Sequence, residues 1–187
     1  MNTVKIRVAS PLADDVIKQL KAGDQVLISG IIYVARDAAH ARLVAALEKG
    51  EKLPFDIQGQ SVYYMGPSPA RPGKVIGSAG PTTSSRMDMF TPRLLAAGLK
   101  AMIGKGGRSP EVRAAMQQYQ AVYFVATGGA AALLAKTIKK SEMIAYPELG
   151  AEAILRITVE GFPALVWNDI YGGDLYEKEN SVYRRVR

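Results

Sequence analysis

The stretch that decides the fold is VLISGIIYVARDAAHARLVAALEKG, residues 26–50, in which a run of apolar residues passes into helical spacing. The first part, Val26 to Val34, has the apolar character of a buried strand. Asp37 is placed to cap a helix that continues through Glu48, with leucine and valine residues at core spacing. Gly50 then supplies the signal for the end of the helix. The pattern predicts a strand followed directly by a helix.

The rest of the chain extends this alternation of strands and helices. Further strands are predicted at Val4 to Ala9, Val62 to Met65, Lys74 to Gly77, Ala101 to Ile103, Val122 to Ala126, Met143 to Ala145, Leu155 to Val159 and Leu165 to Trp167. Helices are predicted at Asp14 to Lys21, from Thr91 to near Gly98, from Ser109 through Gln118, and at Gly129 to Lys136. Thr91 and Ser109 are each followed by a proline and are predicted to cap their helices. Strand-rich ends around a middle that alternates strand and helix favour a layered α/β or α+β domain.

Length and composition limit the class of protein. The chain has 187 residues, of which 48% are hydrophobic and 22% charged, so we expect one folded globular domain. Its apolar runs are too short to cross a bilayer, and Met1 to Ser10 leads into no apolar stretch of the kind found in signal peptides, so we expect a cytoplasmic protein. The absence of cysteine excludes disulfides and thiolate ligands from this chain. A single histidine makes a self-contained transition-metal site improbable on residue chemistry.

The formal net charge of +7 permits two interpretations. Lysines and arginines could neutralise nucleic-acid phosphates. The charges are nevertheless spread along the chain, and the dense cluster from Tyr183 to Arg187 lacks the series of aromatic side chains that single-strand binders use. We therefore interpret the charge as attraction for small acidic substrates or for an acidic partner subunit.

The segment GPTTSSRMDMF, Gly80 to Phe90, places four consecutive hydroxyl side chains and an arginine after a Gly-Pro turn. Free backbone N–H groups at a helix start, together with the hydroxyls of Thr82 and Thr83, could hold a carboxylate. If the segment is helical, Arg86 lies on the same face as Thr82 and can grip the same anion. The alternative is an ordinary serine or threonine helix cap, which explains one hydroxyl of the four.

Three further basic residues stand at positions suited to ligand binding. Arg36 closes a buried strand and precedes a helix, the place where open sheets bind ligands, although a surface salt bridge with Asp37 is the alternative. Lys105 lies in IGKGG, where glycines permit close backbone approach, although a plain flexible loop would also look like this. His40 could orient Arg36 or touch a partner, or be merely structural.

Several common catalytic motifs are absent from the sequence. The spacing of a phosphate-binding P-loop is missing, and the Gly128-Gly129 pair is a packing turn more readily than a dinucleotide fingerprint. Neither a pair of carboxylates at acid-base spacing nor a Ser-His-Asp arrangement is evident. The chain thus offers basic side chains that could bind an anion, and hydroxyls. Any electrophile would have to come from a partner.

Five segments together resemble the β subunit of two-subunit class I fumarate hydratases and L-tartrate dehydratases, which is equivalent to the C-terminal domain of the single-chain enzymes. They are VARDAAHARL (34–43), YYMGPSPARPGKVIGSAGPTTSSRMD (63–88), IGKGG (103–107), VATGGAAALLAK (125–136), and the ending with PELGAEAI and GFPALVWND. The resemblance spans nearly the whole chain, and GPTTSSRMD combined with IGKGG is its most specific part.

The resemblance implies a swivelling β/β/α domain that completes an active site at a subunit interface. In this family the cluster-binding α subunit holds a [4Fe-4S] cluster through three cysteines and leaves one iron free to ligate substrate. A chain without cysteine agrees with the role of the other subunit. The resemblance therefore implies a hetero-oligomer, with self-association into a homodimer as an alternative for the isolated chain.

The same resemblance assigns roles to five residues. Arg36, Arg86 and Lys105 would bind the substrate carboxylates, and Thr82 and Thr83 would contact the substrate, with Thr82 transferring the proton at C3. The expected reaction interconverts (S)-malate and fumarate, and L-tartrate dehydration to oxaloacetate is the alternative. From a different class, a stand-alone anion-binding or nucleic-acid-binding protein stays open on the charge alone.

Overall fold

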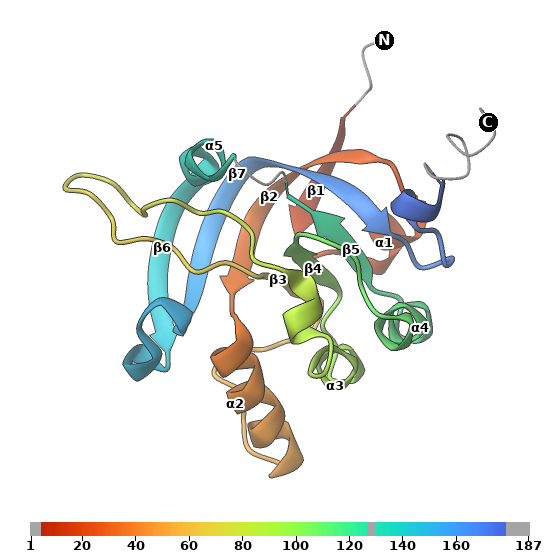
Figure 1. Cartoon of the computed structure of the whole chain (residues 1–187), viewed down its shortest axis with the longest axis horizontal. Helices are drawn as coiled ribbons and strands as arrows, with labels where there is room; N and C mark the ends of the chain where they lie inside the picture. Colours follow the sequence, from red (N-terminus) through yellow and green to blue (C-terminus); the bar gives the residue numbers. More distant parts are fainter. Residues whose placement is uncertain (1–4, 127–129, 179–187) are drawn as a thin grey trace.

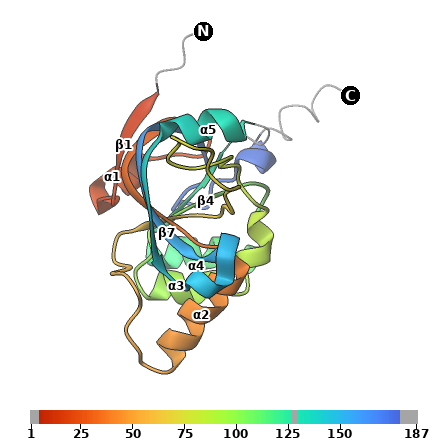
Figure 2. The same ribbon diagram turned by 90° about the vertical axis from the view of Figure 1, so that its left-hand side faces the viewer.

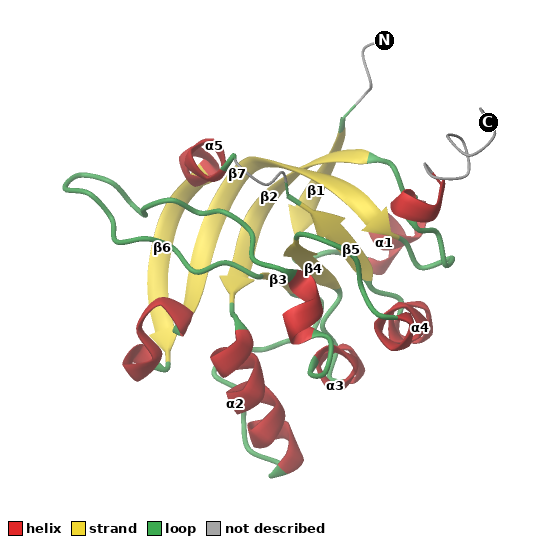
Figure 3. Cartoon of the chain, in the orientation of Figure 1, coloured by secondary structure: helices red, strands yellow, loops and turns green. Residues whose placement is uncertain are grey.

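The structure is a computed structural model that describes residues 5–126 and 130–178 of the chain. In these residues, seven strands form one sheet in the order β1, β2, β3, β4, β5, β7, β6 (Figures 1 and 3). The strands are β1 Ile6–Ser10, β2 Gln25–Val34, β3 Ser61–Tyr63, β4 Ala101–Gly104, β5 Val122–Val125, β6 Ile138–Ala145 and β7 Ile154–Asn168. The α-helices are α1 Asp14–Gln19, α2 Asp37–Glu48, α3 Thr91–Ala96, α4 Pro110–Tyr119 and α5 Ala131–Thr137. The 3₁₀ helices are η1 Ser84–Met87 and η2 Pro147–Glu152. The predicted mixed α/β class is confirmed.

Strand pairing closes part of the sheet on itself. β1 to β5 run parallel to one another, whereas β7 runs antiparallel to its three neighbours, β2, β5 and β6. Because β2 pairs with both β3 and β7, and β7 also pairs with β5, the strands β2, β3, β4, β5 and β7 form a ring. β1 and β6 extend the ring as edge strands.

Alternating side chains on the short parallel strands serve two hydrophobic cores. Tyr63, Ile103 and Phe124 belong to a cluster that draws apolar residues from every strand of the ring and so fills its interior. Their neighbours Val62 and Met102 belong to a second cluster, formed with apolar residues of α2, α3 and α4. The period of two is that of strands buried on both faces. The helices α2, α3 and α4 therefore cover the outer face of the parallel strands, and α5 lies at the opposite end of the molecule (Figure 2).

One predicted strand is absent and two others are joined into one, and both differences have a physical cause. Lys74 to Gly77 is not a strand, because this segment folds back on its own loop: the backbone N–H of Ser68 donates to the carbonyl of Ser78, and the Ser78 N–H donates to the Ser68 hydroxyl. The two strands predicted at Leu155 to Val159 and Leu165 to Trp167 are parts of the single strand β7. β7 continues through Gly161, whose φ of 62° would interrupt a strand pattern read from sequence.

Of three predicted helix caps, one is confirmed and two are wrong. Ser109 caps α4 as predicted, since its hydroxyl accepts from the Val112 N–H. Asp37 and Thr91 are instead the first residues of their helices, and neither helix has a side-chain cap bond. The predicted start of a helix at Gly129 lies outside the described residues, within which α5 begins at Ala131. No helix in the described ranges has the length and apolar character that a membrane crossing requires.

Candidate functional site

Three of the parallel strands deliver the candidate residues to one edge of the sheet. Arg36 follows the end of β2, Tyr64 follows β3, and Lys105 follows β4. The carboxyl ends of neighbouring parallel strands lie side by side at the same edge, which is where open α/β sheets bind ligands. The site predicted from sequence is thus assembled by the strand order β2, β3, β4 (Figure 1).

Backbone pairing joins the hydroxyl run to the glycine loop. Thr83 forms a parallel bridge with Lys105, the Ser84 N–H donates to the Lys105 carbonyl at 2.9 Å, and the Lys105 N–H donates to the Thr82 carbonyl at 3.2 Å. The two motifs, which are more than twenty residues apart in the sequence, therefore form one short ladder. Thr83 and Lys105 are both exposed on it.

The four hydroxyls of the run have different environments. Thr82 is half-buried, and both its N–H and its hydroxyl donate to the Tyr64 carbonyl, at 2.7 and 3.0 Å. Ser84 is buried, whereas Thr83 and Ser85 are exposed. The expected nest of free N–H groups does not form at Thr82 and Ser84, because the Thr82 N–H donates to the Tyr64 carbonyl and the Ser84 N–H donates to the Lys105 carbonyl. Thr82 also precedes the 3₁₀ helix η1, so the helical relationship expected between Thr82 and Arg86 does not apply.

The two candidate arginines meet at one carboxylate. The Arg86 Nε lies 2.8 Å from Asp37 Oδ1, and the Arg36 Nη2 lies 3.8 Å from Asp37 Oδ2 and 3.5 Å from Glu152 Oε1. The salt bridge offered as the alternative reading of Arg36 is therefore present. Arg86 is 51% exposed, and a pair at that exposure contributes at most about 1 kcal/mol to stability. The structure thus brings Arg36 and Arg86 to the same place from two segments of the chain.

Arg36 is packed against the loop that follows β3. A Cβ added at Gly66 would lie 3.1 Å from the Arg36 Cδ, so glycine allows the loop backbone to pass close to the arginine stem. The Arg36 Nε is buried and has no hydrogen-bond partner in the described residues. This loop crosses β7 and β6, where it borders a surface hollow of about 320 Å³.

Arg108, a buried arginine, supports the site from the side of the core. No sequence pattern marked it as a candidate. Arg108 donates from Nε to Asp88 Oδ1 at 2.7 Å, from Nη2 to the Thr91 hydroxyl at 2.7 Å, and from Nη1 to the Tyr64 hydroxyl at 3.3 Å. Asp88 also accepts the Ser109 N–H at 2.7 Å. Burial alone would lower the pKa of Arg108, but Tyr64 and Asp88 outweigh it and hold this pKa above its usual value. The network fixes both motifs to the start of α4.

Tyr123 ties the hydroxyl run to the glycine loop from inside. Its hydroxyl donates to the Gly106 carbonyl at 2.7 Å and lies 2.8 Å from the Ser84 hydroxyl. Burial raises the pKa of the Tyr123 phenol far above its ordinary value, so the phenol stays protonated. Tyr123 and Arg108 therefore hold in place the two backbone segments that carry the exposed residues Lys105 and Thr83.

We expect Gly104→Ala to destabilise the fold and displace the hydroxyl run. A Cβ at this position would collide with the Ser84 hydroxyl and lie 2.9 Å from the Tyr64 Cδ2, and overpacking of this kind costs about 1–3 kcal/mol. The measurement is the free energy of unfolding from urea titration. Gly107→Ala is the matched control, because nothing lies within 4 Å of its added Cβ. Equal midpoints for the two variants would contradict the packing described.

His40 is a structural residue next to Arg36. It is buried, its Nδ1 lies 2.8 Å from the Arg36 carbonyl, and its ring meets Tyr64 edge-on at 5.3 Å between centroids. Burial lowers the pKa of His40 from 6.5 to about 4, so the imidazole is neutral near pH 7. A neutral ring whose Nδ1–H donates to the carbonyl fits this contact.

The His40 pKa leads to a pH dependence of stability. The unfolded chain takes up this proton near pH 6.5 and the folded chain near pH 4, so the free energy of unfolding falls by roughly 3 kcal/mol as the pH is lowered through this window. His40→Asn keeps an N–H donor for the Arg36 carbonyl and removes the titration. We expect the variant to lose less stability than wild type between pH 7 and pH 4.5 in urea titrations. Parallel losses in the two proteins would contradict a neutral buried histidine.

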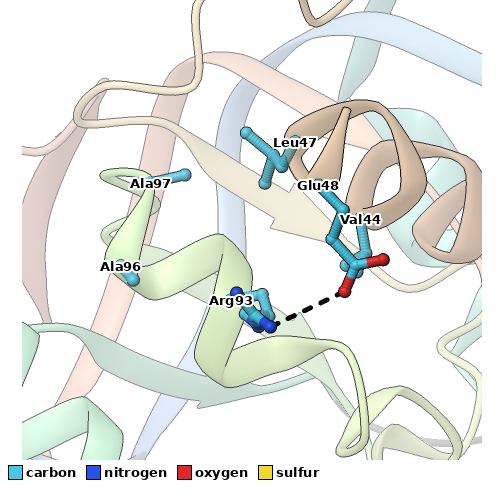
Figure 4. A pocket seen from close by; sticks show the side chains of 6 residues that line it. All are labelled: Val44, Leu47, Glu48, Arg93, Ala96 and Ala97. Atoms are coloured by element: carbon cyan, nitrogen blue, oxygen red, sulfur yellow. Dashed lines mark ion pairs between the residues drawn. The ribbon is translucent and has the colours of Figure 1, made fainter. Parts of the chain in front are cut away.

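The hollows of the surface lie away from the candidate cations. One hollow of about 240 Å³ lies between α2 and α3 and is lined by Val44, Leu47, Ala96 and Ala97. The ion pair between Glu48 and Arg93, at 3.7 Å, crosses it (Figure 4). Neither this hollow nor the one beside β6 is lined by Arg36, Arg86 or Lys105. Arg86 and Lys105 are exposed, whereas Arg36 is only 18% exposed.

The residues near the site are not a metal-ligand set. The sequence contains no cysteine, and the described residues hold no group of three His, Asp or Glu side chains that could bind a metal ion. The donors are instead cations and hydroxyls, which suit a carboxylate.

Comparison with known proteins identifies relatives along most of the chain. Residues 1–179 match the family model described as Fumarase C-terminus. The chain is 40% identical over 164 residues to the aerobic class I fumarate hydratase of Escherichia coli, which covers 87% of this chain and 30% of the relative. It is 39% identical over 181 residues to fumarate hydratase 2 of Leishmania major, with 94% of this chain and 32% of the relative covered.

A third relative matches the chain in length. The putative L(+)-tartrate dehydratase subunit beta of Methanocaldococcus jannaschii is 38% identical over 177 residues, which cover 91% of each protein. The chain thus spans about a third of the fumarate hydratases it matches and nearly the whole of this subunit.

Proposed function

We propose, on the premise that this chain belongs to the Fumarase C-terminus family, that it is the non-cluster subunit of a hydro-lyase acting on dicarboxylates. The observation that carries the proposal is that Arg36 and Arg86 share the Asp37 carboxylate, while Thr83, three residues before Arg86, pairs with Lys105 after β4. Three cations beside hydroxyls match a ligand with two carboxylates and a hydroxyl. The names of the relatives support the class of reaction.

The residues of this chain would bind the diacid and move a proton. Loss of water from a hydroxy diacid removes hydroxide from one carbon and a weakly acidic proton from its neighbour. As that proton leaves, negative charge develops on the adjacent carboxylate, where Arg86 and Lys105 would stabilise it. Thr82 is the proposed proton carrier at C3. Its hydroxyl donates to the Tyr64 carbonyl. A threonine hydroxyl is a poor base, so a nearby cation would have to stabilise its alkoxide.

The proposal assigns the [4Fe-4S] cluster to a cluster-binding partner subunit. A chain without cysteine does not fit as the holder of such a cluster. The contribution of this chain is then limited to binding the carboxylates and transferring the proton. The proposal also includes a site completed at a subunit interface, by a single swivelling β/β/α domain that closes on the partner, as the family resemblance implies. The exposure of Arg86 and Lys105 supports this arrangement.

Fumarate and (S)-malate are the proposed substrates, and L-tartrate is the second candidate. The identity to fumarate hydratases supports the first. The match in length to the M. jannaschii subunit supports the second. Tartrate carries one more hydroxyl than malate and would need one more polar contact, for which exposed Ser85 is available.

The test is anaerobic co-expression with the cluster-binding subunit from the same genome, followed by assays on malate and L-tartrate side by side. We expect the complex to dehydrate one diacid far faster than the other, and the isolated chain to be inactive. A complex that acts on neither diacid would overturn the proposal. Tight, salt-sensitive binding of the isolated chain to RNA or DNA, with no response to dicarboxylates, would favour the nucleic-acid alternative.

A further inference from the structure

Asp37 occupies a position between the two candidate arginines. It is the first residue of α2, directly after Arg36 in the chain, and reaches Arg86 on η1. Its Oδ1 lies 2.8 Å from the Arg86 Nε, and its Oδ2 lies 3.8 Å from the Arg36 Nη2. One carboxylate thus joins two cations that come from segments about fifty residues apart.

The contact engages one side of the Arg86 guanidinium. Asp37 meets it at Nε, and no other ion pair or hydrogen bond engages the group within the described residues. A guanidinium can grip a carboxylate in parallel through two nitrogens, and the two terminal Nη groups form one such fork. With Nε against Asp37, that fork is left for an incoming carboxylate.

The surroundings hold Asp37 in place. Asp37 is 27% exposed and stands in the first turn of α2, where the helix dipole favours a negative charge. Behind it, Glu152 of η2 accepts the Ala38 N–H at 2.9 Å and pairs with Arg36. Asp37 is therefore the less exposed partner of the pair, and Arg86, at 51% exposed, is the side chain with more conformational freedom.

We propose that Asp37 is a positioning residue for the carboxylate-binding arginines, and that its charge keeps Arg86 beside Arg36 with its terminal fork free. This rests on the proposed function, because it deepens the role of the same site. Two guanidinium groups so close together would repel each other without a shared anion. The opposite possibility is that Asp37 competes with the substrate for the arginines. The two roles predict opposite changes in KM for the diacid when the charge of Asp37 is removed.

The kinetic test uses Asp37→Asn, Asp37→Glu and a matched control in the assembled complex. We expect Asp37→Asn, which keeps the shape and removes the charge, to raise KM for the diacid about 10-fold or more, since a misplaced clamp loses near-attack geometry. Asp37→Glu restores the charge and should return KM to within about 3-fold of wild type. Glu148→Gln is the control, because it removes a carboxylate from another exposed pair of α2, Arg42–Glu148 at 3.6 Å, which joins α2 to η2. An unchanged or lowered KM in Asp37→Asn would overturn the proposal.

A second measurement separates failure of this proposal from failure of the proposed function. In the isolated chain labelled with ¹⁵N-arginine, the Nε–H signal of Arg86 is assigned by its loss in Arg86→Lys. We expect Asp37→Asn to move this signal and speed its exchange with water, and Glu148→Gln to leave it in place. An Arg86 signal that does not respond to Asp37→Asn would refute the positioning role, whether or not the complex proves to be a hydro-lyase.

Discussion

Arg86→Ala in the assembled complex is expected to lower kcat by about 10²- to 10³-fold, the usual effect of removing one donor from a developing negative charge. The guanidinium is exposed at the edge where Thr83 and Lys105 meet, and its only described ion pair is with Asp37. Removal should leave the fold intact, because an exposed pair adds little stability. The measurement is steady-state turnover of the diacid together with the thermal midpoint of the variant.

Two further substitutions define what the Arg86 result means. Arg86→Lys keeps the charge and loses the planar fork, so it should recover part of the activity only. Arg93→Ala removes a comparable arginine, 67% exposed and paired with Glu48 at 3.7 Å across the hollow between α2 and α3, and should leave turnover unchanged. Wild-type turnover in Arg86→Ala would remove this residue from the site.

Thr82→Val is expected to suppress proton exchange at C3 of the substrate, by about 10²- to 10⁴-fold, the range of positioned proton transfer. The half-buried hydroxyl donates to the Tyr64 carbonyl at 3.0 Å, and valine keeps the shape while deleting that oxygen. The measurement is incorporation of deuterium from D₂O into malate at equilibrium with the complex. Because the substitution leaves the arginines in place, KM should change far less than the exchange rate.

The control for Thr82 is a neighbouring hydroxyl to which no role in the malate reaction is assigned. Ser85→Ala deletes an exposed hydroxyl of the same run and should leave exchange intact. Normal exchange in Thr82→Val would exclude Thr82 as the proton carrier while leaving the carboxylate-binding role of the chain in place. Loss of exchange in both variants would point instead to a general disturbance of the run.

The sequence predicted the parts of the site that local patterns reveal. Strand ends before Arg36 and Lys105, and the hydroxyl run before Arg86, are readable because strand periodicity and glycine or proline punctuation are local. The bridge between Thr83 and Lys105 confirms that the two motifs adjoin. The roles given to the five candidate residues stay predictions.

The unpredicted parts depend on contacts between distant residues. Arg108 and Asp88 stand twenty residues apart in the sequence, and neither lies in a spacing that indicates a buried pair. The pairing of β7 with β2 that closes the ring joins residues more than 120 positions apart. β6 was foreseen only at Met143 to Ala145, because its edge position leaves Lys139 and Lys140 exposed and hides the strand pattern.

The most direct test of the central claim is a titration of this chain into its cluster-loaded partner subunit under anaerobic conditions, with hydration of fumarate as the readout. We predict that turnover rises from near zero to a plateau at one chain per partner. The triple variant Arg36→Ala, Arg86→Ala, Lys105→Ala should bind the partner equally well and give no turnover. Full turnover by the partner alone, or by the complex with the triple variant, would contradict the claim that this chain supplies the carboxylate-binding cations.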